Sequence, residues 1–185
     1  DAIQADARSA RAYAGLADCY GVSYYYIGER PRDAVQQVET YASKAIELDP
    51  TLAEPHTSRG FAYFLDWNMS SSEKEFLRAI ELNPNYPTAH HWYSRYLRAV
   101  GRNDEAWKEI NRARELEPLS LIFLNNIAEM QIDRGELKKA EALAQRIIEL
   151  DNSFWAGHQT LSIVLIKEGR FTEAHSEAQK SVEVS

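Results

Sequence analysis

The chain has 185 residues, 44% hydrophobic and 26% charged, so it is long enough for a buried core and too apolar for a disordered segment. Its 21 lysines and arginines against 28 aspartates and glutamates give a net charge of −7, which argues against binding to nucleic acid or anionic lipid. With a single cysteine and no apolar run near the ~18 residues of a membrane span, the chain is expected to be cytoplasmic and to stay out of membranes.

A short motif recurs along the chain at a spacing of 34 residues. It reads Ala45-Ile-Glu-Leu-Asp-Pro50, Ala79-Ile-Glu-Leu-Asn-Pro84 and Ala113-Arg-Glu-Leu-Glu-Pro118, and it continues in weaker form at 147–152. A fixed period of roughly 20 to 50 residues is the signature of a solenoid built from repeated supersecondary units. The sequence therefore predicts a repeat protein.

We number each repeat so that its proline occupies position 32. Segment 1–7 then resembles the tail of a preceding repeat, and 8–52 is an elongated repeat with nine extra residues, because Ala7 and Pro50 are 43 apart instead of 34. The segments 53–86, 87–120 and 121–154 are regular repeats, and 155–185 is a truncated last one. Small residues recur at position 8, for example Ala17 and Gly60, where two helices can approach closely.

Local signals predict two helices in each repeat. Gly101, Gly135 and Gly169 stand at position 15, where a left-handed residue ends a first helix. The proline ends the second helix, and capping-box spacing at 51–54 and 70–73 suggests helix starts. The predicted helices are 9–27, 32–48, 52–66, 71–82, 87–100, 104–116, 120–134, 137–150, 154–168 and 172–184.

Five residues of the second repeat carry a family resemblance. Gly60, Tyr63, Phe76, Ala79 and Pro84 fit the pattern W-x2-L-G-x2-Y…A-x3-F…P, and the chain resembles the tetratricopeptide repeat family. The resemblance implies an all-α fold, a right-handed α-α superhelix, with 1–185 as a single array. The runs 10–20, 64–67 and 83–93 resemble arrays of bacterial regulatory proteins, where they follow winged-helix, nucleotide-cyclase or kinase domains. We expect a segment of such a larger protein.

No catalytic or metal site is expected. His56, His90 and His158 share position 4, but helices stack about 8–10 Å apart whereas zinc holds its ligands at about 2.0–2.1 Å, so these residues cannot share an ion. Cys19 falls at position 10 of a helix, where we expect a packed thiol and not a nucleophile. There is no glycine-rich phosphate loop. We predict a non-enzymatic chain without cofactors.

The stripe most suited to binding a partner consists of positions 2, 5, 9 and 12 of the first helices. In tetratricopeptide arrays this stripe lines a concave groove, and the resemblance implies the same here. The candidate partner-binding residues are Asp18, Thr57, Phe61, Phe64, His91, Arg95, Arg98, Asn125, Glu129, Gln159 and Ile163. Phe61 should lie beside Arg95 and Phe64 beside Arg98, a combination typical of interface hot spots and suited to an acidic, aromatic peptide. The alternative is an ordinary solvated groove.

Two further interpretations stay open at this point. The run Tyr24, Tyr25 and Tyr26 either packs an elongated helix against its neighbour or adds a recognition edge. The function we predict is binding of a peptide or helix of a partner protein. The alternative is a structural spacer, within a multidomain signalling enzyme or transcription regulator, that self-associates through exposed terminal helices bearing Val182 and Val184.

Overall fold

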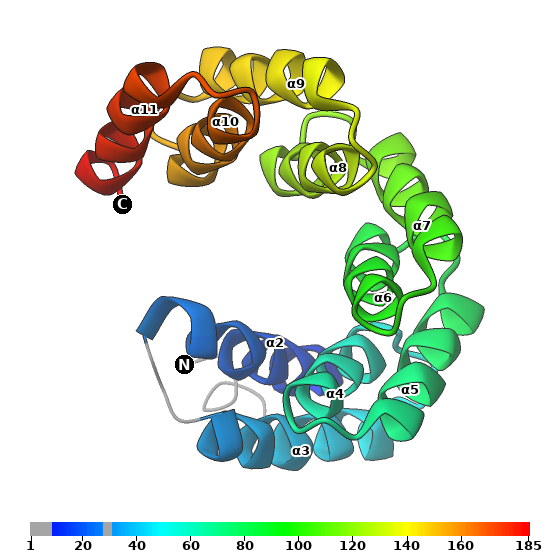
Figure 1. The fold of residues 1–185 in the computed structure, drawn as a ribbon. Coiled ribbons are helices and arrows are strands. Elements are labelled where there is room, and N and C mark those ends of the chain that lie inside the picture. Colours follow the sequence, from blue (N-terminus) through cyan, green and yellow to red (C-terminus); the bar gives the residue numbers. More distant parts are fainter. Residues whose placement is uncertain (1–8, 28–30) are drawn as a thin grey trace. The chain divides into compact units, whose positions relative to one another are not determined.

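The fold was analysed in a computed structural model that describes residues 9–27 and 31–185, with side chains described for 9–22 and 33–185. All regular structure in these ranges is α-helical, and the helices follow one another as antiparallel pairs (Figure 1). They are α2 (Ala10–Ile27), α3 (Pro31–Leu48), α4 (Glu54–Leu65), α5 (Met69–Leu82), α6 (Pro87–Ala99), α7 (Asn103–Leu116), α8 (Leu121–Asp133), α9 (Leu137–Leu150), α10 (Trp155–Lys167) and α11 (Phe171–Glu183). Every predicted helix is confirmed, with ends within two residues.

The chain has two compact units, Asp1–Glu109 and Ile110–Ser185, which we call the first and the second unit. In the first unit, α4 packs against both α2 and α3, and α6 packs against α4 and α5. In the second unit, α10 packs against α8, α9 and α11. Each unit is thus built from helix hairpins of the α-α superhelix class. The repeat boundaries assigned from the sequence stay a prediction.

Small residues at repeat positions 8 and 20 join the two helices of a hairpin. The Ser72 hydroxyl donates to the Gly60 carbonyl at 2.8 Å, and the Ser94 hydroxyl donates to the Ala106 carbonyl at 2.8 Å. A Cβ added at Gly60 would lie 2.9 Å from the Phe76 ring, closer than packed atoms tolerate. The hydrogen bond and the close approach together fix the pairing of each hairpin.

The turn between the helices of a pair is closed in the same way in four repeats. Gly101, Gly135 and Gly169 have positive φ angles of 81°, 75° and 77°, which confirms the predicted left-handed ends. The N–H of the following residue donates to the carbonyl five residues earlier, as in Arg102 to Leu97 at 2.8 Å. Trp67 occupies this position in the remaining turn, with φ of 58°, and its side chain is 83% exposed.

The predicted capping boxes are wrong. Ser70 and Glu73 lie inside α5, whose N-cap is Asn68, and the Asn68 side chain accepts a hydrogen bond from the Ser71 N–H. Thr51 donates through its hydroxyl to Asp49 at 2.6 Å and leaves the start of α4 without a side-chain cap. Because the turn at Trp67 places Asn68 at the N-cap, α5 begins at Met69, earlier than the capping-box spacing at 70–73 indicated.

Cys19 is exposed, which corrects the expectation of a packed thiol. At the same position 10, Ala62 is buried because it packs on Ala17 and Val38 of the preceding helix pair. No described helix precedes α2, so the described residues provide no such cover for Cys19. The side chains of Tyr24, Tyr25 and Tyr26 lie outside the described residues, and both interpretations of that run stay predictions.

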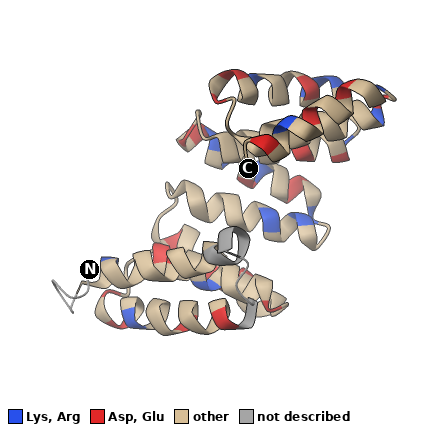
Figure 2. Cartoon of the chain, turned by 90° about the vertical axis from the view of Figure 1, so that its left-hand side faces the viewer, with Lys and Arg blue, Asp and Glu red and all other residues tan. Residues whose placement is uncertain are grey.

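No helix among the described residues combines the length and the apolar character needed to cross a membrane. Figure 2 shows acidic and basic residues on helices of both units in the described part of the chain.

Candidate partner-binding surfaces

On α4 of the first unit, the stripe residues differ in exposure. Thr57 and Phe61 are buried, Phe61 at 2% exposure, and Phe64 is half-buried. Asp18 of α2 is exposed. Phe61 is one of the candidate partner-binding residues, but at this burial its ring packs inside the unit and has no open face.

Trp92, which is not among the candidate partner-binding residues, covers Phe61. The two rings are stacked with centroids 3.9 Å apart. The Arg95 guanidinium lies 5.5 Å from the centroid of the Trp92 ring on its own helix, a cation–π arrangement. Phe61 and Arg95, which were predicted to lie side by side, are therefore connected through Trp92.

Four half-buried side chains of α4 and α6 form what we call the Trp92 surface: Phe64, Trp92, Arg95 and Arg98. Phe64 also contacts the buried Tyr96 edge to face, with centroids 6.3 Å apart. Aromatic faces beside two guanidinium groups combine apolar area with directional donors for carboxylates. Such a surface suits an acidic peptide with aromatic side chains.

His91 lies next to the Trp92 surface and is buried, with its ring 4.7 Å from that of Trp92. Burial, with a smaller effect from the Arg95 charge, lowers the pKa of His91 to about 3. The imidazole is therefore neutral at physiological pH. The positive charge of this region comes from the two arginines.

In the second unit the stripe has amide and aliphatic character. The buried Asn125 amide accepts from the Thr160 hydroxyl at 2.9 Å and donates to the Glu129 carboxylate at 3.0 Å. Gln159 and Ile163 of α10 are exposed, and Ile166, which was not among the candidate residues, is 52% exposed. The structure thus gives this stripe a hydrogen-bonded base and an apolar outer part.

The three histidines at position 4 each pair with a glutamate 19 residues later, in the second helix of the same repeat. The distances from Nδ1 to the carboxylate are 2.6 Å for His56 and Glu75, 2.6 Å for His90 and Glu109, and 2.7 Å for His158 and Glu177. In the elongated repeat the equivalent residues are the stacked pair Tyr13 and Tyr41, with centroids 6.4 Å apart. These pairs join the helices of a hairpin.

No group of three or more metal-binding side chains occurs among the residues that the structure describes. The geometry of position 4 accounts for the histidines by packing and hydrogen bonding within single repeats.

A family model described as tetratricopeptide repeat matches residues 75–108, one full period from within α5 to α7. The same period, the glycine turns and the small residues at positions 8 and 20 recur in both units. Residues 75–108 thus carry a tetratricopeptide repeat.

Sequence comparison adds one curated relative, anaphase-promoting complex subunit 3 of Schizosaccharomyces pombe. It is 30% identical over 112 residues, which are 59% of this chain and 16% of that protein. The matched region is therefore a small part of the relative, and the relative's assembly says nothing by itself about this chain.

Solved structures of similar fold include pilF of Pseudomonas aeruginosa, with a TM-score of 0.73, 17% identity and coverage of 94% of this chain and 78% of that one. The Cut9-Hcn1 hetero-tetramer of the APC/C gives a TM-score of 0.83 at 13% identity, over 98% of this chain and 33% of that one. YrrB, a TPR protein described as having an unusual peptide-binding site, gives 0.60 at 16% identity, over 100% and 90%. These likenesses establish the fold. Tetratricopeptide repeats are in general non-catalytic scaffolds for protein interaction.

Proposed function

We propose that this chain is a non-catalytic module that binds a peptide or helix of a partner protein. The partner would lie in a concave groove lined by repeat positions 2, 5, 9 and 12 of the first helices. The observation that carries the proposal is the Trp92 surface, where the ring of Trp92 stacks on Phe61 and the Arg95 guanidinium lies over the Trp92 ring. A fixed aromatic ring loses little conformational entropy on binding, so it is a favourable anchor. The peptide-binding site named for YrrB supports the same class of function.

The partner segment we propose is acidic and contains aromatic residues. Arg95 and Arg98 are three residues apart on α6 and therefore neighbours on its surface. Charge-assisted hydrogen bonds from guanidinium groups to carboxylates are roughly twice as strong as neutral ones. The contrast with the overall charge of −7 makes this surface selective for a negatively charged ligand.

A synthetic peptide that alternates phenylalanine and aspartate is a suitable probe, with lysine in place of aspartate as its control. Titration calorimetry should show that the acidic peptide binds and that the lysine peptide does not. Arg95→Ala should weaken it by about 2 kcal/mol, the scale of a hot-spot residue. Arg146→Ala on α9 is the matched control, because Arg146 is an exposed arginine that pairs one turn away with Glu149. Equal weakening by both variants, or equal binding of both peptides, would refute the groove assignment.

A second candidate function is self-association, as a structural spacer. It is favoured by α11, where Phe171 is 68% and Val182 is 76% exposed, and by the half-buried Val184 directly after that helix. Sedimentation of the chain with its natural flanking sequence, over a wide concentration range, tests this candidate. A strict monomer at the highest concentration would remove it.

The cellular setting is part of the proposal. The runs 10–20, 64–67 and 83–93 support a place in the cytoplasmic part of a larger bacterial regulatory protein, where the repeats would receive a signal from the partner. Reading the gene on both sides of this segment tests it. Further repeats alone on both sides would exclude an attached effector domain.

A further inference from the structure

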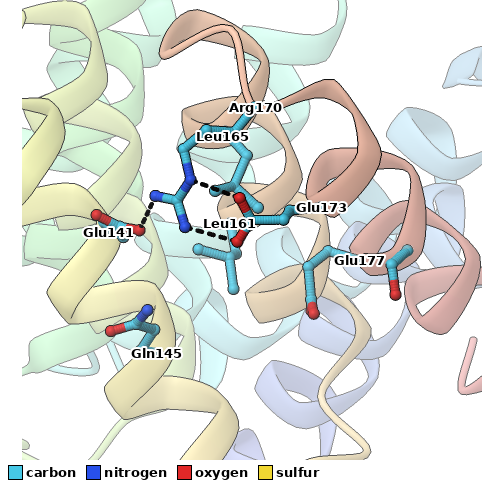
Figure 3. A pocket seen from close by; sticks show the side chains of 8 residues that line it. Glu141, Gln145, Leu161, Leu165, Arg170, Glu173 and Glu177 are labelled. Atoms are coloured by element: carbon cyan, nitrogen blue, oxygen red, sulfur yellow. Dashed lines mark hydrogen bonds and ion pairs between the residues drawn. The ribbon is translucent and has the colours of Figure 1, made fainter.

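In the second unit, α9, α10 and α11 line a pocket of about 220 Å³ that is open to solvent on one side (Figure 3). Leu161 and Leu165 of α10 form its apolar wall and are only 7% and 2% exposed. Arg170 lies at one side, between Glu141 of α9 and Glu173 of α11, and pairs with both. An engineered cavity of about 150 Å³ binds benzene, so this pocket has room for a phenol ring. The other lining residues are Gln145, Ser176 and Glu177.

We call the ion pairs of Arg170 with Glu141 and Glu173 the charged frame of the pocket. The first unit contains an equivalent charged frame two repeats earlier. Arg102, at the repeat position of Arg170, pairs with Glu73 and Glu105, which stand at the positions of Glu141 and Glu173. In both units the arginine bonds to the glutamate that stands 29 residues before it, in the preceding repeat. The two frames share these ion pairs, and the second one also includes Glu168, which pairs with Arg170, and Lys138, which pairs with Glu141.

In the first unit a tyrosine lies beside the frame. Tyr93 stands at the repeat position of Leu161, is buried, and donates its hydroxyl to Glu73 at 3.1 Å. Tyr96 donates to the other oxygen of the same carboxylate at 3.4 Å. Burial, with Glu73 contributing, raises the pKa of Tyr93 to about 12, so the phenol keeps its proton and remains a donor.

The elongated repeat shows the same association a second time. Burial, with Glu39 contributing, raises the pKa of Tyr63 to about 12, and Glu39 stands at the repeat position of Glu73. Glu141 is the third glutamate at this position, and its partners are Arg170 and Lys138. The positions that supply tyrosines elsewhere hold Leu161, Val164 and Leu165 in the second unit.

We propose that the α9–α11 pocket binds a tyrosine side chain of a partner protein, with the ring against Leu161 and Leu165 and the hydroxyl donating to Glu141. The partner would supply in trans the phenol that the chain itself supplies in the first unit. A cationic ligand is disfavoured because Arg170 and Lys138 already compensate the carboxylates. This pocket shares no residue with the Trp92 surface, so the two proposals stand or fall separately.

The test uses p-cresol, which is the tyrosine side chain as a free molecule, and toluene, which lacks only the hydroxyl. Methyl NMR of the whole chain should show saturable shifts of the Leu161 and Leu165 methyls with p-cresol. Because a hydrogen bond to a carboxylate is lost, toluene should bind about tenfold more weakly. Leu161→Tyr should fill the pocket from within, abolish the shifts at Leu165 and raise Tm.

Two variants keep the outcome decisive. Glu141→Gln should remove most of the preference for p-cresol over toluene, whereas Glu149→Gln, further along the same helix and exposed, should leave it unchanged. Absence of saturable shifts, equal affinity for the two probes in the natural chain, or unchanged binding in Leu161→Tyr would each overturn the proposal. If Leu161→Tyr does not fold, the Glu141→Gln comparison decides.

Discussion

On α6 of the first unit, repeat positions 5, 6 and 9 hold His91, Trp92 and Arg95, whereas on α10 of the second unit they hold Gln159, Thr160 and Ile163. The first set makes aromatic and cation–π contacts, with rings 3.9 to 5.5 Å from their partners. In the second set Thr160 instead bonds the buried Asn125.

The helices that carry these two sets are held by the same devices. Ser94 and Ser162, both at position 8, donate to the carbonyls of Ala106 and Ala174 at 2.8 and 2.9 Å. His90 and His158 make the same carboxylate contact in each unit. The comparison shows that hairpin pairing is fixed by a few repeat positions, which leaves the stripe free to vary in chemistry.

The largest effect is expected for Trp92→Ala. It removes the ring that covers Phe61 and supports Arg95, and it opens the packing between α4 and α6. Truncating a packed aromatic residue costs about 3 kcal/mol. Urea denaturation should show that loss of unfolding free energy, while Gln159→Ala, an exposed residue of the second unit, should change it by less than about 0.5 kcal/mol. Equal losses would mean that Trp92 is not part of the packing.

The second unit should be most sensitive at Asn125. Asn125→Ala leaves the buried Thr160 hydroxyl without this acceptor and removes the Asn125 amide that donates to Glu129. An unsatisfied buried polar group costs about 2 kcal/mol. The double variant with Thr160→Val should recover part of this loss, because both partners are then apolar. Additive losses in the double-mutant cycle would contradict the coupling.

The sequence was sufficient for the helices and their turns, because glycine and proline act locally and recur at fixed repeat positions. It was insufficient for the stripe. Choosing residues by position placed Phe61 in the groove and omitted Trp92, whose ring reaches from position 6 over the neighbouring helix. The 19-residue spacing of histidine and glutamate was present in three repeats and could have indicated the pairs, but only a three-dimensional structure shows which atoms meet.

The four turns allow a matched test of backbone strain. Gly101 has φ of 81°, and a Cβ added there would meet no atom within 4 Å, so Gly101→Ala changes little besides the backbone preference. It should cost about 1 kcal/mol, the scale of the left-handed penalty for a residue with a Cβ. Trp67→Gly should stabilise the first unit by a similar amount, since Trp67 already bears that penalty and is exposed. Thermal denaturation measures both. A destabilised Trp67→Gly variant would show that the indole contributes contacts that exceed the strain.

The smallest effect concerns pH and the paired glutamates. Although burial acts in the opposite direction, hydrogen bonds from His56 and Arg59 lower the pKa of Glu75 below its ordinary value of 4.5. A lowered folded-state pKa stabilises the fold above the unfolded-state value, and this contribution is lost as the pH falls through the folded value. The natural chain should therefore exceed Glu75→Gln in unfolding free energy by about 1 kcal/mol or less at pH 5.5, and the difference should shrink toward pH 3.

The second unit provides the matching case for this pH dependence. Glu177→Gln should behave like Glu75→Gln, because Lys180 and His158 lower the pKa of Glu177 against the effect of burial. The repeat with Leu124 at position 4 has no histidine for such a pair. Denaturation series at several pH values measure the difference, and one that widens on acidification would show that the carboxylates are stabilised in their protonated form.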